Sequence, residues 1–176
     1  MIQPFIIRHP TSADAQDLAE IHVRSWQAAY RGLLPDELLN NLSVAQRLPF
    51  WTRTVEQNPT SVLVGVEGGE NGRLVGFVSF GPSRDEDANP DTSAEIYAIY
   101  LLAESWGHGY GAKLWQAALA RLQTESYQDV MLWVLKGNDR AIRFYQAAGF
   151  ATDGGAKTEN YRDIAELHEL RYRRKL

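Results

Sequence analysis

The chain has 176 residues, a formal net charge of −4, 44% hydrophobic residues and no cysteine. This size and apolar content predict a single domain over residues 1–176 and exclude collagen-like, coiled-coil and disordered classes. The acidic balance argues against a nucleic-acid-binding protein, and the missing thiols exclude disulfides, thiolate metal sites and cysteine nucleophiles.

The first third of the chain predicts a strand followed by helices. Residues 2–8 are apolar enough for a strand, and Thr11 with Asp14 forms a T-x-x-D capping signature for the helix that follows. That helix is expected to stop at Gly32. A short helix is then predicted from Pro35 to residue 42, and Ser43 is placed to cap another through residue 57.

From residue 60 the pattern is typical of strands. Two apolar runs, 61–66 and 74–80, flank a glycine-rich turn and predict an antiparallel hairpin. Residues 82–92 form a polar, acidic loop, which is either solvated or placed to attract a cationic amine. Residues 95–102 are apolar enough for a central strand.

The second half predicts a β-α-β unit. A helix with apolar residues at 114–122 follows three glycines, and a strand is expected at 129–135. A helix over 138–148 should end at Gly149, with extended chain from Phe150 and a terminal strand at 165–172. Antiparallel pairs followed by this crossover predict an α/β fold with a mixed, largely antiparallel central sheet flanked by helices.

Three alternating glycines, Gly107, Gly109 and Gly111, lie between a predicted strand and a predicted helix. Glycine lets a ligand approach the backbone, and the N–H groups at a helix start favour anions, so the turn could hold a pyrophosphate. For alternating glycines alone, a plain tight turn into a helix is the more frequent explanation. The residues around Lys113 do not fit a P-loop, and the spacing departs from the G-x-G-x-x-G of dinucleotide-binding folds.

Two longer motifs make the pattern specific. Residues 95–114, EIYAIYLLAESWGHGYGAKL, and residues 138–150, NDRAIRFYQAAGF, resemble the two central motifs of the GNAT N-acetyltransferase superfamily, in the family's order. Arg8, Asp17 and the closing run from Glu169 also fit, so the resemblance covers nearly the whole chain. The chain departs from the family at Trp106, where Gln or Arg is preferred.

The resemblance implies an acyl-CoA-binding fold that moves an acetyl group from acetyl-CoA to a primary amine. It implies that backbone at the end of the 95–101 strand bonds the pantetheine arm, with the Leu101 N–H polarising the thioester carbonyl. The cofactor-binding residues that it implies are Ile99, Tyr100, Leu101, Gly107, His108, Gly109, Tyr110, Gly111, Ala112 and Asn138. Asn138 is also placed to cap the helix that it precedes.

Two side chains are implied to be catalytic. Glu95 is the expected general base, acting through a water, although it could also be an ordinary edge glutamate. Tyr145 occupies the F-Y position of the second motif and is the expected general acid for the leaving thiolate, although it also belongs to the apolar stripe of its helix. Without a cysteine or a G-x-S-x-G elbow, direct attack by the amine in a ternary complex is the simplest mechanism.

The acceptor is a small-molecule or peptide amine of unspecified identity, and Trp26 and Tyr30 either form an aromatic wall of its site or belong to the core. A non-catalytic acyl-CoA-binding sensor of the same fold is the alternative function. The four histidines lack metal-ligand spacing, so no metal is expected. Dimers are common among similar proteins, which makes a homodimer a candidate assembly.

The N-terminal apolar segment is too short for a signal peptide, and no apolar run reaches 18 residues. The sequence therefore predicts no membrane partner, no nucleic-acid partner and a cytoplasmic location.

Overall fold

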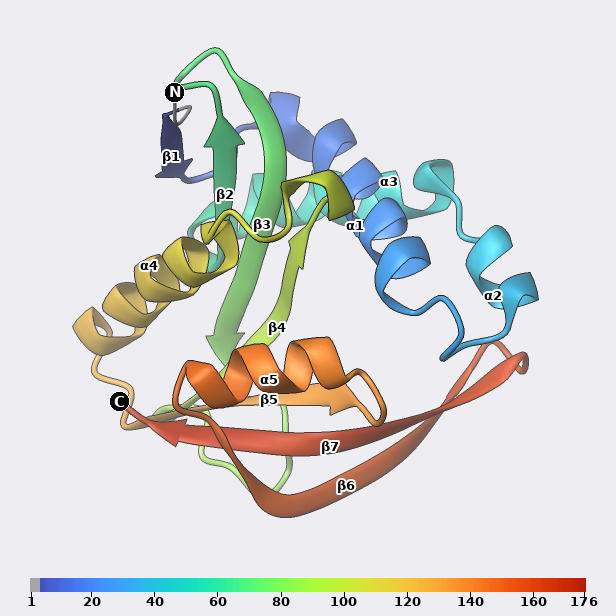
Figure 1. Cartoon of the computed structure of the whole chain (residues 1–176). Helices are drawn as coiled ribbons and strands as arrows, with labels where there is room; N and C mark the ends of the chain where they lie inside the picture. Colours follow the sequence, from blue (N-terminus) through green and yellow to red (C-terminus); the bar gives the residue numbers. More distant parts are fainter. Residues whose placement is uncertain (1–3) are drawn as a thin grey trace.

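Seven strands form one mixed sheet, in the order β1-β2-β3-β4-β5-β7-β6, in the computed structural model, which describes residues 4–176 (Figure 1). Only β4 and β5 pair in parallel; the other neighbours are antiparallel. The predicted mixed, largely antiparallel sheet is confirmed. The strands are β1 Phe5–Arg8, β2 Val62–Glu67, β3 Arg73–Pro82, β4 Ser93–Leu101, β5 Asp129–Leu135, β6 Ala151–Tyr161 and β7 Ala165–Lys175.

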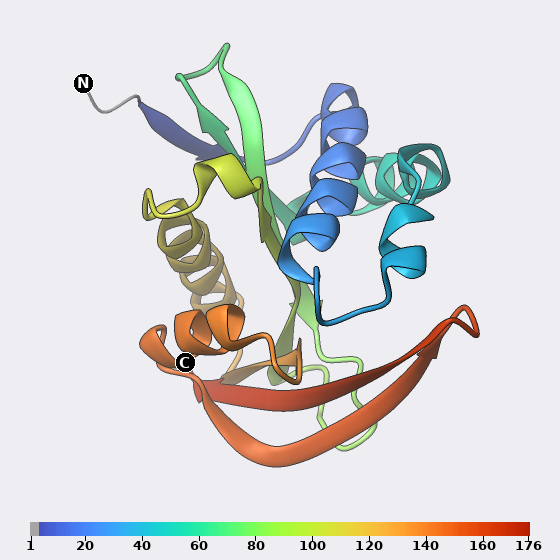
Figure 2. The same cartoon turned by 45° about the vertical axis from the view of Figure 1, so that its right-hand side comes forward.

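Helices cover both faces of the sheet. Helices α1, α2 and α3 lie on one side, and α4 and α5 lie on the other (Figure 2). None of the helices within residues 4–176 combines the length and the apolar character needed to cross a membrane. The helices are α1 Ala15–Ala29, α2 Asp36–Asn40, α3 Val44–Gln57, α4 Tyr110–Thr124 and α5 Asp139–Ala147.

The core has one part on each face. Leu114, Trp115 and Leu122 of α4 pack on one side of the sheet, whereas Leu18 of α1 and Trp51 of α3 pack on the other. Burying one apolar side chain of this size stabilises the folded state by about 1.5 to 3 kcal/mol. Both helix layers therefore contribute to the stability of the sheet.

Local sequence signals explain several helix starts. Thr11 and Asp14 form the predicted capping box, and the Asp14 carboxylate also accepts hydrogen bonds from Arg8 at 2.7 and 2.9 Å. The Ser43 hydroxyl accepts the Gln46 N–H at 3.4 Å, as predicted for the start of α3. Residues 2 and 3 of the first predicted strand lie outside the described residues.

The C-terminal hairpin is longer than the sequence indicates. Strand β6 spans 11 residues and β7 extends three residues beyond the predicted end at position 172. Strand β6 is an edge strand with mostly exposed side chains, so it carries no apolar alternation to reveal it. The turn of this hairpin packs near α2, where Leu167 contacts the cluster that holds Leu34 and Leu38 (Figures 1 and 2).

The acidic loop between β3 and β4 is fixed by ion pairs. Asp85 and Asp87 lie 2.9 and 2.7 Å from Arg171 of β7, and the Trp133 indole N–H donates to Asp85 at 3.0 Å. Arg171, which is half-buried, therefore holds both carboxylates, although Asp87 itself remains exposed to solvent.

Strand β4 carries the two irregularities that matter for a site. It pairs with β5 only from Ser93 to Glu95, after which the two strands diverge. On its other side, Ser79 of β3 pairs with Ala98 and Phe80 pairs with Ile96, so Tyr97 is an extra residue that forms a β-bulge. The sheet therefore opens beside the second half of β4.

Candidate active site

Two cavities meet at the opening between β4 and β5. The glycine-turn cavity, of about 360 Å³, lies toward α4 and α5, and the aromatic cavity, of about 720 Å³, lies toward α1 and α3. The two cavities adjoin where both are lined by the same residues, and this region is called the passage: Tyr30, Ile96, Tyr97, Ala98, Tyr100 and Trp133. A ligand in one cavity would therefore lie beside a ligand in the other.

The glycine turn shapes one end of the glycine-turn cavity. Gly107 and Gly109 have φ angles of +81° and +76°, and a Cβ atom on either would meet no protein atom within 4 Å. The first backbone bond of α4 runs from the Lys113 N–H to the Gly109 carbonyl at 3.2 Å. In the described chain no side chain caps this helix, so its first N–H groups are available to an anion.

Most residues implied to bind the cofactor line this cavity. They are Ile99, Tyr100, Leu101, Gly107, Gly109, Tyr110, Gly111, Ala112 and Asn138. The exception is His108, whose exposed ring stacks on Tyr110 with 5.6 Å between ring centroids. The Asn138 side chain also accepts the Ala141 N–H at 3.3 Å, so it caps α5 while it lines the cavity.

The backbone of β4 presents hydrogen-bonding groups to the opening. The Leu102 N–H donates to the Val75 carbonyl at 2.9 Å, which makes Leu101 and Gly76 a non-hydrogen-bonded antiparallel pair. The N–H and C=O of Leu101 consequently both point away from β3. The Leu101 carbonyl accepts bonds from Ser25 and Trp106 at 3.1 and 3.0 Å, and its N–H is directed to the same open side.

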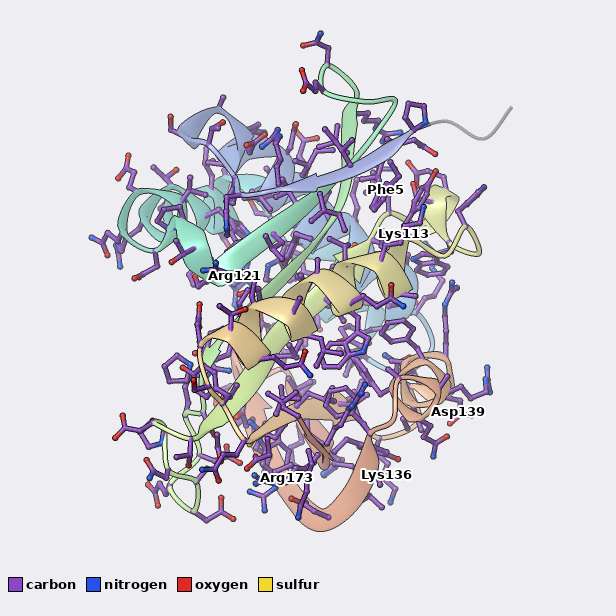
Figure 3. The ribbon with its side chains drawn as sticks, turned by 90° about the vertical axis from the view of Figure 1, so that its left-hand side faces the viewer. Phe5, Lys113, Arg121, Lys136, Asp139 and Arg173 are labelled. Atoms are coloured by element: carbon purple, nitrogen blue, oxygen red, sulfur yellow. The ribbon has the colours of Figure 1, made fainter. Side chains whose placement is uncertain are left out.

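Sequence reasoning missed one cationic residue of this cavity. The guanidinium of Arg140 lies 3.5 Å from the centre of the Trp106 ring, and both residues line the cavity beside the glycine turn. Burial lowers the pKa of Arg140, and no ion pair of this residue is found within residues 4–176. Arg140 directly follows Asp139 in the chain. Figure 3 shows Asp139 on the same side of the molecule as Lys113, which lies at the start of α4.

Glu95 lies in the aromatic cavity, where its side chain is 4% exposed. Its carboxylate accepts three hydrogen bonds from Arg84: from the backbone N–H at 3.0 Å, from Nε at 3.1 Å and from Nη2 at 2.5 Å. The Arg84 guanidinium also lies over the Tyr97 ring at 4.2 Å. The carboxylate is thus an ion-paired group at the β-bulge and not an unpaired edge glutamate.

Tyr145 lies on the other side of the opening, on α5, and its ring contacts Phe144 and Phe150. Burial, with a smaller effect of nearby Tyr100, raises the pKa of Tyr145 above its usual value. The phenol is therefore uncharged at neutral pH, as an ordinary tyrosine is, and burial makes it a weaker acid.

Trp26 and Tyr30 both line the aromatic cavity and also pack against the α2 cluster, so the two readings of these residues are compatible. The Trp26 indole N–H donates to the Tyr100 hydroxyl at 2.8 Å, which fixes that ring beside the passage. Burial raises the pKa of Tyr30, and neighbouring Tyr100 and Tyr145 raise it further. The three tyrosines therefore lie close together where the cavities meet.

The aromatic cavity also contains titratable groups that sequence reasoning did not single out. Burial, with a smaller effect of Arg47, lowers the pKa of His22 to about 3, so its imidazole is uncharged. Burial raises the pKa of Glu169, partly offset by Lys157. Among the described residues no three His, Asp or Glu side chains gather as a metal site.

Comparison with known proteins gives matches along most of the chain. Residues 15–150 match the model of the acetyltransferase (GNAT) family. An uncharacterized N-acetyltransferase from Bacillus subtilis, YuaI, is 34% identical over 141 residues, which are 80% of this chain and 77% of that protein.

Solved structures share the fold at lower identity. The PaiA N-acetyltransferase from Thermoplasma acidophilum, in complex with coenzyme A, has a TM-score of 0.67 at 20% identity and covers 98% of this chain and 99% of its own. A Salmonella typhimurium protein, solved with its cofactor acetyl-CoA, has a TM-score of 0.70 at 20% identity and covers 98% of this chain and 94% of its own.

Proposed function

The chain belongs to the GNAT family and is an N-acetyltransferase that uses acetyl-CoA, and from this premise we propose that it transfers the acetyl group to a primary amine by direct attack of the amine on the thioester. The observation that carries this proposal is the passage between the two cavities beside β4. A donor in the glycine-turn cavity and an acceptor in the aromatic cavity would meet there, within one ternary complex.

The glycine-turn cavity fits the donor's phosphates. The left-handed Gly107 and Gly109 leave open space before uncapped N–H groups of α4, and the dipole of that helix favours anions. The Arg140 guanidinium forms no ion pair with a carboxylate within residues 4–176. It would add a positive charge at the glycine-turn end of this cavity. The family prefers Gln or Arg at the position of Trp106. In this chain the Trp106 ring would hold the Arg140 guanidinium in place, so that Arg140 would supply the polar group instead.

The strand β4 would bind the extended part of the donor. Leu101 directs its N–H into the opening, where β5 no longer pairs with β4. When bound, acetyl-CoA supplies an activated acetyl thioester. The Leu101 N–H would stabilise negative charge that develops on the carbonyl oxygen, because a preorganised donor acts without reorganisation.

Proton transfers would be made by side chains on either side of the passage. A primary amine has a pKa of about 10.4, so it must lose a proton before it attacks. Glu95 would accept this proton through a water, with Glu169 in the same cavity as the second candidate carboxylate. Tyr145, which lines the glycine-turn cavity, would donate a hydrogen bond or a proton to the leaving thiolate.

An acceptor screen tests the proposal. Release of free thiol from acetyl-CoA is followed with a broad panel of primary amines, and at least one acceptor is expected to release thiol in proportion to N-acetylated product. Absence of turnover with every amine would contradict the amine-acceptor proposal. Because the sequence contains no cysteine, we expect no acetylated protein after incubation with acetyl-CoA alone; a covalent acetyl-enzyme found by mass spectrometry would contradict direct attack.

A further inference from the structure

Three cationic side chains line the aromatic cavity, and two of them form ion pairs with carboxylates of the protein. Arg84 pairs with Glu95 at 2.5 Å, and Lys157 pairs with Glu159 at 2.6 Å and with Glu169 at 3.3 Å. The third, Arg47 of α3, forms no ion pair with any described residue of the chain. Its guanidinium donates only a long hydrogen bond, of 3.4 Å, to the Tyr161 hydroxyl.

Several aromatic residues line the same cavity as Arg47. The cavity wall around it includes Trp26, Phe50 and Trp51, and Arg47 itself is half-buried. The Trp51 indole N–H is buried without a hydrogen-bond acceptor in residues 4–176. A guanidinium that has lost part of its hydration and has no counter-ion favours an anion with oxygen acceptors, and a carboxylate-like group fits its planar fork.

The carboxylates of the cavity are less available to a ligand. Glu95, Glu159 and Glu169 are held by Arg84 and Lys157, as given above, and Asp85 is held by Arg171. Glu86 lies exposed at the rim. Lys157 is one cation between two carboxylates, so one negative charge of that group and the charge of Glu86 are left for the amine end of an acceptor. Arg47, by contrast, has no carboxylate partner among the described residues.

We propose that the acceptor is a primary amine that also carries an anionic oxygen group, a carboxylate or a phosphonate, and that Arg47 binds that group. This inference rests on the proposed function, because it names the class of amine that the aromatic cavity takes. The acceptor would lie with its acidic group toward α3 and its amine toward the passage beside β4. Arg47 is then a specificity-determining residue and takes no part in proton transfer.

Matched acceptor pairs test the inference. The pairs are L-phenylalanine and L-phenylalaninamide, L-methionine and L-methioninamide, and 4-aminobutyrate and butylamine, each assayed for thiol release at saturating acetyl-CoA. The acidic member of a pair is expected to have the higher kcat/KM by about 10- to 100-fold, the range of a charged hydrogen bond. Equal kcat/KM for both members of every pair would overturn the inference.

Variants of α3 locate the effect. Arg47→Gln is expected to raise the KM of the acidic acceptor by about 10- to 100-fold, with kcat, the KM of acetyl-CoA and the kinetics of the neutral member unchanged. Arg47→Lys should recover part of the loss. Arg53→Gln is the matched control, since Arg53 is exposed on the same helix and outside the cavity. Equal losses for acidic and neutral members in Arg47→Gln would overturn the inference, and melting curves check that the variant is folded.

Binding separates this inference from the proposed function. Calorimetric titration of the same acids and amides into the CoA-bound protein reports Arg47 recognition without turnover. Acids that bind in the wild type and not in Arg47→Gln, with no thiol released, would contradict acetyl transfer and support the acid site. If no acid binds more tightly than its neutral partner, the acid site is wrong even where amines are acetylated.

Discussion

At the scale of single residues, the site depends on pairs that sequence spacing does not reveal. Glu95 lines the aromatic cavity and Tyr145 lines the glycine-turn cavity. The partners that set their chemistry come from elsewhere: Arg84 holds the Glu95 carboxylate, and Tyr100 of β4 lies near Tyr145. Such contacts require the folded chain, so the sequence could predict the residue types but not their ionic partners.

Substitution of Tyr145 tests the proton donor. Tyr145→Phe keeps the ring and its contacts with Phe144 and Phe150 but removes the hydroxyl. We expect kcat to fall on the order of 100-fold, the usual contribution of a general acid, while the Kd of CoA stays within a factor of two or so. Steady-state kinetics and CoA titration measure the two quantities. Trp115→Phe, a core change on α4, controls for loss of packing. An unchanged kcat would remove Tyr145 from the mechanism.

A second residue-scale prediction distinguishes two carboxylates. Glu95→Gln should flatten the acid limb of the pH profile of kcat/KM, because the group that must be unprotonated is gone, whereas Glu169→Gln should keep that limb. Since burial raises the pKa of Glu169, a limb that disappears only in Glu169→Gln would identify that residue as the base instead. Profiles from pH 5 to 9 are measured for the wild type and both variants.

At the scale of elements, the sequence predicts the helices and strands whose limits are marked by neighbouring residues in the chain. Helix α3 and strand β5 have the predicted limits because a serine cap and a run of apolar residues mark them. Strand β6 had no such pattern, since its side chains face solvent and its pairing comes from β7. The glycine turn was predicted as an anion site only together with the two longer motifs, because alternating glycines alone fit a plain tight turn. Arg140 was missed because its position depends on stacking against Trp106.

The turn that starts α4 gives an element-scale prediction. Gly109→Val puts a branched side chain into the open space before the α4 N–H groups and strains a φ of +76°. We expect CoA binding to weaken by at least about tenfold, equivalent to about 1.4 kcal/mol. Gly154→Val is the matched control, because Gly154 of β6 also has a positive φ, +86°, and open space around its Cβ position. Calorimetric titration with CoA measures both variants, and equal affinities would contradict the anion site.

At the scale of the whole molecule, one sheet separates two helix layers and joins two cavities through a single opening. The α1–α3 layer surrounds the aromatic cavity and holds an uncharged histidine, His22, in contact range of Trp26, Trp51 and Tyr100. The stability of the fold is therefore coupled to the protonation of a group that lines the aromatic cavity.

The pH dependence of unfolding tests this coupling. His22 has a pKa of about 3 in the folded protein, while in the unfolded chain it titrates near 6.5. As the pH falls below 6.5 the unfolded state takes up a proton that the folded state does not, so stability decreases until the pH approaches the folded value. Between pH 6.5 and 5 this loss is about 2 kcal/mol at most. Urea unfolding should show a smaller loss over this interval in His22→Gln than in the wild type, and equal losses would contradict the assignment.

The bulge at Tyr97 has a consequence for the parity of residue numbers along β4. In a regular strand the even-numbered side chains share one face, yet Ala94 and Ile96 pack with α4 while Ala98 and Tyr100 pack with α1 and α3. An odd-numbered carboxylate, Glu95, and an even-numbered phenol, Tyr100, line the aromatic cavity together because one additional residue lies between them. Removing Tyr97 would make Ile96 and Ala98 neighbours, and their side chains already face opposite sides of the sheet. The shortened strand would therefore alternate strictly and keep Glu95 and Tyr100 on one face, while it would lose the ring that the Arg84 guanidinium covers.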